Sequence, residues 1–271
     1  MPPLEIAGRV GRVLARFDQA EVLLVTDLTN IHWLTGFTGS NGWALLTPSG
    51  VVLITDGRYG HQATAQMARA GVDGRVIVGL SSPAMLDALA TEVAGFGSVG
   101  FEAAHVSYEQ FQRFESLFTT TLVPVSGVVE AERRRKDAGE IARMAEACRI
   151  ADIALSEVAN DLEGRTEVEV RNRLEIRMRE LGASGPSYET IVATGPVNAA
   201  LPHHRPTDTR IETGHTVIID VGALYDGYHS DMTRTFFVGE PTQQQLELYE
   251  VVLAAQRAGV DAVETGISTA A

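Results

Sequence analysis

The chain has 271 residues, which at about 100 to 200 residues per domain predicts two domains or one large one. Hydrophobic residues make up 45% of the sequence and charged residues 21%, a balance typical of globular proteins that excludes disordered and fibrous classes. The net charge of -13 argues against nucleic acid and anionic membranes as partners, because both would repel an acidic surface.

The compartment can be predicted from what the sequence lacks. It contains no run of about 18 apolar residues, and its first residues do not form the apolar core of a signal peptide. Cys148 is the only cysteine, so we expect no disulfide framework, which fits a reducing compartment. These features predict a cytoplasmic protein. Cys148 is expected to lie on a helix, to pack into the protein core and not to act as a nucleophile.

Residues 1–130 alternate short apolar runs with helical stretches, the pattern of a small α/β domain. The expected strands are 22–25, 43–46, 51–55, 75–78 and 98–101, and the expected helices are 6–17, 60–69, 83–94 and 107–118. The glycines Gly36, Gly39 and Gly42 have the spacing of a dinucleotide-binding loop, but an apolar strand-like run follows them where that loop requires a helix. They therefore predict a turn between two strands.

The pattern changes after a short basic connector, and the remaining residues, 131–271, form a second predicted domain with longer helices. Asp137 predicts the start of one long helix. Thr166 and Glu169 have the spacing of a capping box, which predicts the start of a second helix with an apolar stripe. A third helix is expected over 243–264.

A predicted hairpin between these helices carries two aspartates. Asp220 interrupts an apolar strand, and a lone charge in such a run is costly to bury without a cationic partner. Asp226 and Gly227 then predict a two-residue type I′ turn, and the returning strand carries Asp231.

A tight turn fixes the register, which pairs Gly222 with Asp231 and Asp220 with Thr233. The two aspartates would then share a face as diagonal neighbours, with Cβ atoms at most about 7 to 8 Å apart, and Gly222 would leave the space between them free of side chain. Two carboxylates that converge on an open pocket suit divalent metal ions. The alternative is that both are solvated residues of an edge hairpin.

His203 lies between prolines in a segment too irregular to be a helix or strand. A histidine in such a loop can hydrogen-bond a carbonyl oxygen or a developing oxyanion. Alternatively, it is a solvated side chain without a role.

Several motifs resemble one family in their order and spacing. Leu201-Pro-His203-His-Arg-Pro-Thr-Asp, Ile218-Ile-Asp220-Val-Gly-Ala and Gly227-Tyr-His-Ser-Asp231-Met-Thr-Arg-Thr resemble the Xaa-Pro aminopeptidase and prolidase family of pita-bread metallopeptidases. The stretches Asn30-Ile-His-Trp-Leu-Thr-Gly-Phe-Thr-Gly-Ser-Asn41 and Thr55-Asp-Gly-Arg58-Tyr59 resemble the creatinase-type N-terminal domain of the same proteins.

The resemblance implies an α/β creatinase-like domain over residues 1–130 and an α+β pita-bread catalytic domain, of which residues 131–271 would be the first half. It implies two divalent metal ions, with manganese expected first and cobalt or zinc as alternatives. Asp220 would hold one ion, Asp231 would bridge both, and His203 would bind the substrate carbonyl or stabilise the tetrahedral intermediate.

The implied activity is hydrolysis of the peptide bond before proline, as an Xaa-Pro aminopeptidase or an Xaa-Pro dipeptidase. The partners implied are proline-containing peptides and a second copy of the chain in a homodimer. The sequence leaves the choice between aminopeptidase and dipeptidase open.

The chain departs from the family pattern in its ligands. The family's remaining ligands, a histidine and two glutamates, would fall beyond residue 271, so we expect these residues alone to bind metal weakly, to be inactive, and to leave one sheet face uncovered. A competing interpretation is a non-catalytic pita-bread relative that binds peptides or protein partners. Creatine hydrolysis would leave both aspartates unexplained, and methionine aminopeptidases generally lack the N-terminal domain.

Overall fold

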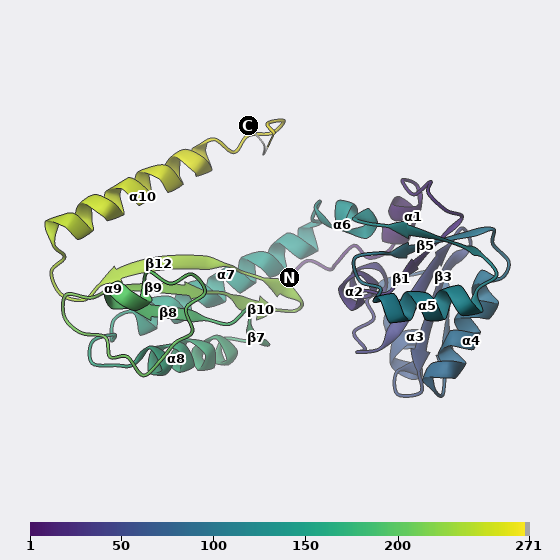
Figure 1. Ribbon diagram of the computed structural model, residues 1–271, viewed down its shortest axis with the longest axis horizontal. Helices are drawn as coiled ribbons and strands as arrows, with labels where there is room; N and C mark the ends of the chain where they lie inside the picture. Colours follow the sequence, from purple (N-terminus) through teal and green to yellow (C-terminus); the bar gives the residue numbers. More distant parts are fainter. Residues whose placement is uncertain (269–271) are drawn as a thin grey trace. The chain divides into compact units, whose positions relative to one another are not determined.

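The computed structural model describes residues 1–268 and divides into two compact units between Gly139 and Glu140, with Met1 assigned to the second unit (Figure 1). This division lies slightly C-terminal to the boundary expected from the sequence, and the assignment of 1–130 and 131–271 as domains stays a prediction. Within residues 1–268, no helix combines the length and the apolar character needed to cross a bilayer.

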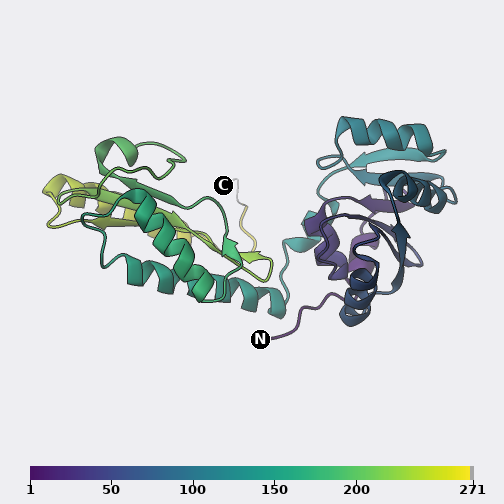
Figure 2. The same cartoon turned by 90° about the horizontal axis from the view of Figure 1, so that it is seen from below.

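The N-terminal unit is built on a six-stranded mixed sheet with the order β4-β3-β2-β1-β5-β6. Its strands are β1 (Val22–Val25), β2 (Gly42–Thr47), β3 (Gly50–Asp56), β4 (Gly74–Gly79), β5 (Ser98–Glu102) and β6 (Thr121–Val125). Its helices are α1 (Arg9–Leu14), α2 (Leu28–Thr35), α3 (Gly60–Ala70), α4 (Ser82–Val93), α5 (Tyr108–Leu117) and α6 (Val128–Arg133). Alternate residues of β1 join two different core clusters, so both faces of the sheet are covered by helices (Figure 2). This double burial explains why β1 is apolar throughout.

Three elements of this unit were not predicted from the sequence. One is α2, which begins where the Asp27 side chain accepts a hydrogen bond from Thr29 N and ends at Gly36 with φ 74°. The glycine-rich stretch therefore joins a helix to a strand, and the prediction of a turn between two strands is wrong. The edge strand β6 contains Pro124, which weakens its strand signal, and α6 is only six residues long.

The C-terminal unit contains two antiparallel three-stranded sheets, β11-β10-β7 and β12-β9-β8. The strands are β7 (Gly185–Pro186), β8 (Ile191–Thr194), β9 (Thr216–Val221), β10 (Ala223–Tyr225), β11 (Tyr228–His229) and β12 (Met232–Phe237). The helices are α7 (Ala138–Val158), α8 (Glu167–Glu180), α9 (Gly195–Asn198) and α10 (Gln243–Asp261). The predicted capping box of α8 is present, with Thr166 and Glu169 bonded reciprocally.

One face of β9 is buried and the other is not. Val217, Ile219 and Val221 point into a core that also contains buried residues of α7 and α8. The alternate residues, Ile218 and Asp220 among them, are only half-buried. The strand thus places its one carboxylate on the less covered face of the sheet.

Cys148 corrects one sequence prediction, because it is exposed on α7. The buried stripe of this helix includes Ala147, Ile150, Ala151 and Ala154, at the three- and four-residue spacing of one helix face. Cys148 follows directly after Ala147, about 100° around the helix, and so leaves the core.

Candidate functional site

The hairpin forms as the sequence predicts. Asp226 and Gly227 have φ of 46° and 82°, the two positive values that a type I′ turn requires. Tyr225 pairs with Tyr228 beside the turn, and the same register continues to the Asp220–Thr233 pair. The predicted register is therefore confirmed on both sides of the interruption between the two sheets.

Gly222 lies at that interruption, and its surroundings differ from the prediction. A Cβ atom at this position would lie 2.0 Å from Ser230 O and 2.9 Å from Ser187 Oγ. Ser187 N donates to Gly222 O at 2.8 Å, and Ser187 Oγ donates to Ser230 O at 2.7 Å. The space that was expected to be empty is thus filled by Ser187 and Ser230. Glycine is needed at position 222 because the backbone of Ser230 comes too close for a side chain.

Both aspartates contact the same atom, the hydroxyl oxygen of Tyr188. This hydroxyl lies 2.7 Å from Asp220 Oδ1 and 3.0 Å from Asp231 Oδ1. Asp220 is half-buried and Asp231 is exposed. The two carboxylates therefore converge, although they belong to different strands of the hairpin and Tyr188 comes from the segment between β7 and β8.

The negative charges of Asp220 and Asp231 are not balanced by a positive charge within their contacts with Tyr188. A phenol has a single proton, so Tyr188 can donate to only one of the two carboxylates at a time. Burial and the hydrogen bonds to Asp220 and Asp231 raise the pKa of Tyr188 far above its usual range, because a phenolate there would face two negative charges. Tyr188 is thus a neutral donor, and the pair of carboxylates lacks a cation among these contacts.

This donor set fits a divalent metal ion. Carboxylate oxygens are hard ligands that suit magnesium, calcium and manganese. Within residues 1–268, no third His, Cys, Asp or Glu completes a ligand cluster with Asp220 and Asp231. Two carboxylates are fewer protein ligands than an enzyme's metal site ordinarily uses, so this pair would supply only part of such a site.

The third predicted site residue, His203, lies apart from this contact network. It is exposed and has a left-handed backbone with φ 53°. Within residues 1–268, no hydrogen bond or ion pair joins its side chain to Asp220 or Asp231. The next residue, His204, is buried, and its Nε2 atom lies 2.8 Å from Glu167 Oε2.

Glu167, in the first turn of α8, anchors the segment that carries His203. Its Oε1 atom accepts hydrogen bonds from Thr194 N at 2.7 Å and Asn198 Nδ2 at 3.0 Å. Its Oε2 atom accepts from His204 Nε2 at 2.8 Å, Thr207 N at 2.9 Å and Thr207 Oγ1 at 2.8 Å. Burial alone would raise the pKa of Glu167, but these hydrogen bonds outweigh it and hold the pKa below the usual range.

Sequence reasoning missed Glu167, although a signal was present. Glu167 lies on the same helical stripe as Val170, Leu174 and Met178, all of them buried. A carboxylate in line with a buried stripe has to find hydrogen-bond donors.

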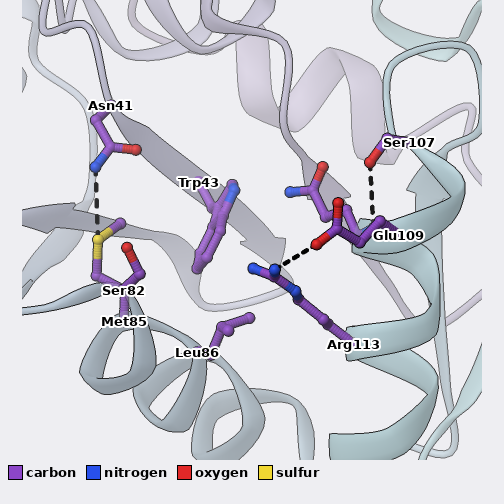
Figure 3. A pocket seen from close by; sticks show the side chains of 9 residues that line it. Asn41, Trp43, Ser82, Met85, Leu86, Ser107, Glu109 and Arg113 are labelled. Atoms are coloured by element: carbon purple, nitrogen blue, oxygen red, sulfur yellow. Dashed lines mark hydrogen bonds and ion pairs between the residues drawn. The ribbon is translucent and has the colours of Figure 1, made fainter.

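A hollow of about 220 Å³ in the N-terminal unit is a weaker candidate (Figure 3). Trp43 lines it, and its charged residues are satisfied locally, since Arg113 pairs with Glu109. It therefore offers no group of carboxylates comparable to the hairpin.

Both parts of the chain match known families. Residues 142–271 match metallopeptidase family M24, and residues 9–134 match the creatinase/prolidase N-terminal domain. The "Uncharacterized peptidase YqhT" of Bacillus subtilis is 38% identical over 91% of this chain and 69% of its own length. The Xaa-Pro dipeptidase of Pyrococcus horikoshii is 30% identical over 96% of this chain and 72% of its own.

Solved structures agree with these matches. The Xaa-Pro dipeptidase from Bacillus anthracis has a TM-score of 0.91 and 34% identity, and the match covers 97% of this chain and 73% of that one. The prolidase from Pyrococcus horikoshii OT3 has a TM-score of 0.87 and 30% identity, over 96% of this chain and 73% of that one. The family and the fold class predicted from the sequence, a creatinase-type domain followed by a pita-bread domain, are confirmed.

Proposed function

Because the chain belongs to metallopeptidase family M24 and carries a creatinase/prolidase N-terminal domain, we propose that it is an exopeptidase that hydrolyses the peptide bond before proline. Similar proteins from Pyrococcus horikoshii and Pyrococcus furiosus are named Xaa-Pro dipeptidase, which supports proline-containing peptides as substrates. The observation that carries the proposal is the convergence of Asp220 and Asp231 on one point.

In this proposal Asp220 would hold one divalent ion and Asp231 would be a ligand of both ions. Manganese is expected first, with cobalt and zinc compatible with oxygen ligands. When bound, two such ions would supply a nucleophile for peptide hydrolysis at neutral pH. Because two aspartates are few ligands, we expect that this pair by itself binds metal weakly and that further ligands are needed for hydrolysis.

His203 is proposed to bind the substrate carbonyl. Its neighbours His204 and Thr207 are fixed by the buried carboxylate of Glu167. His203 is therefore presented from a restrained backbone while its side chain stays exposed to a substrate. A histidine in that position can donate to a carbonyl oxygen as negative charge develops on it.

The proposal also covers the cellular compartment and the oligomeric state of the protein. An exposed, unpaired cysteine at Cys148 fits a reducing compartment, so we propose a cytoplasmic enzyme. A homodimer is proposed from the family resemblance.

The experiment is to incubate the full-length protein, with its further metal ligands, with manganese and follow release of the N-terminal residue from Xaa-Pro dipeptides and from longer Xaa-Pro peptides. Metal-dependent release is expected, with matched Xaa-Ala peptides as the control. Cleavage of the dipeptides alone would identify a dipeptidase. Tight peptide binding without any metal-dependent release would instead support the non-catalytic interpretation.

The role of His203 is tested separately with His203→Ala. We expect kcat to fall while manganese binding is unchanged, because the side chain is assigned to the substrate and not to the metal. Unchanged kcat would remove His203 from the site.

A further inference from the structure

A second set of potential metal ligands lies entirely within the N-terminal unit. Asp27 caps the first turn of α2, His105 follows β5, and Glu130 belongs to α6. One ligand atom from each of the three lies within 4.8 Å of the other two. Residues far apart in the sequence are thus brought to one point by the ends of three elements.

The spacing of these atoms suits a shared ion better than direct hydrogen bonds. His105 Nε2 lies 3.8 Å from Asp27 Oδ2 and 3.9 Å from Glu130 Oε1. Hydrogen bonds between such atoms are about 2.7 to 3.2 Å long. Two ligands bound at about 2.1 Å to one ion lie about 3.4 Å apart in a tetrahedron and at most about 4.2 Å apart.

The two carboxylates are held in place by other groups. Asp27 Oδ1 accepts from Thr29 N at 3.0 Å, which leaves Oδ2 directed at His105. Asn30 is fully buried, and its Nδ2 atom donates to Glu130 Oε1 at 2.6 Å. Outer contacts of this kind orient metal ligands before an ion arrives.

Asn30 is itself fixed on two sides. Its Nδ2 atom also donates to Glu102 Oε1 at 2.6 Å, and Arg133 donates to its Oδ1 atom at 2.7 Å. Glu102 is buried and also accepts from Thr26 N at 2.6 Å. Every donor and acceptor of the Asn30 amide is therefore hydrogen-bonded, which fixes the orientation of the amide. The fixed amide in turn orients the carboxylate of Glu130.

An ion could reach this point from solvent. Two of the three ligands, His105 and Glu130, line a hollow of about 190 Å³ together with Glu102 and residues 125–129. The side chains of Asp27, His105 and Glu130 are 19%, 43% and 37% exposed. Water can therefore complete the coordination of an ion held by three protein atoms.

We propose that Asp27, His105 and Glu130 form a binding site for a divalent transition ion of the zinc class, distinct from the Asp220–Asp231 pair. One imidazole and two carboxylates are a mixed nitrogen and oxygen set, which favours zinc over magnesium. The partial exposure of the ligands predicts moderate affinity. The competing interpretation is an ordinary ion pair in which a protonated His105 lies between two carboxylates.

The test is a zinc titration of the chain carrying Asp220→Asn and Asp231→Asn, which removes the other candidate site. The readout is the ¹⁵N chemical shift of the histidine side chains, with the His105 signal assigned by its loss in His105→Gln. We expect the His105 Nε2 signal to move and to saturate with one bound ion. Magnesium at the same concentration should leave it in place.

Two conservative variants separate a three-ligand site from a single imidazole. Asp27→Asn keeps a residue that caps α2, and Glu130→Gln keeps an oxygen acceptor for Asn30, so both should fold. Each is expected to weaken zinc binding at least about tenfold, whereas His61→Gln, at an exposed histidine of α3, should have no effect. No movement of the His105 signal, a zinc affinity in either variant equal to that of the parent chain, or an equal response to magnesium would each overturn the proposal.

Discussion

In the C-terminal unit, the carboxylate of Glu167 and the pair formed by Asp220 and Asp231 differ in how many hydrogen bonds they receive. Glu167 is completely buried and accepts hydrogen bonds from four residues through both oxygens. Asp220 and Asp231 are more exposed, and the hydroxyl of Tyr188 is the donor they share.

The difference distinguishes a structural carboxylate from one that can bind a ligand. The charge of Glu167 is satisfied by the fold, so removing it would leave buried donors unpaired. The charges of Asp220 and Asp231 exceed what one phenol proton can satisfy, so a cation would lower their energy. The Asp231 and Glu167 variants below each test one side of this comparison, and a Gly222 variant tests the backbone of the hairpin that carries the two aspartates.

Asp231→Asn is expected to have the largest effect. In the full-length protein with its further ligands, loss of this proposed ligand should reduce metal-dependent hydrolysis of Xaa-Pro peptides at least about a thousandfold, which is about 4 kcal/mol of transition-state stabilisation. Asp226→Asn, in the turn of the same hairpin, is the matched control and should retain activity because asparagine suits this turn. Similar losses in both variants would indicate that the hairpin is damaged as a whole.

Glu167→Ala should mainly affect stability. We expect a loss of about 3 kcal/mol in the free energy of unfolding, measured with urea, because Thr194 N and His204 would lose a buried acceptor. Glu180→Gln, at an exposed carboxylate of the same helix, should change it by less than about 0.5 kcal/mol. A small effect of Glu167→Ala would contradict the structural role assigned to this residue.

Gly222→Ala tests the close approach between the two sheets. The added Cβ would collide with Ser230 O, and we expect a loss of about 1 to 3 kcal/mol in the free energy of unfolding. Gly11→Ala is the control, since a Cβ there meets nothing within 4 Å and α1 should be unchanged or slightly more stable. Equal stability of the two variants would show that the backbone can move aside at Gly222.

The smallest effect concerns pH. The folded pKa of Glu167 lies below its usual value of 4.5, so its contribution is fully present above that value and is lost as the pH falls through the lowered pKa. Glu167→Gln removes this contribution at every pH, so its stability should fall less steeply on acidification than that of the wild type. Urea unfolding at a series of acidic pH values measures both slopes, and parallel curves would exclude Glu167 as a source of acid sensitivity.

The parts of the site that were predictable are those fixed by neighbours in the sequence. Asp226 and Gly227 determine the turn, and the turn determines the register that brings Asp220 beside Asp231. The capping box at Thr166 is equally local, because its two partners lie three residues apart.

The parts that could not be predicted depend on contacts between distant segments. Tyr188 reaches Asp220 and Asp231 across 32 and 43 residues, and nothing in its local sequence indicates those partners. Gly222 was expected to leave an open space, whereas the backbone of Ser230, between β11 and β12, and the side chain of Ser187 fill it. Cys148 was expected in the core because apolar residues surround it in the sequence, but one turn of this helix contains both buried and exposed residues.

The most direct test of the central claim, that Asp220 and Asp231 together form a metal site, is a manganese titration followed by electron paramagnetic resonance. We predict that the wild-type chain binds manganese and that Asp220→Asn and Asp231→Asn each weaken this binding at least about tenfold, while Glu189→Gln, an exposed carboxylate close to Tyr188 in the sequence, does not. Equal manganese binding by the wild type and both aspartate variants would contradict the claim.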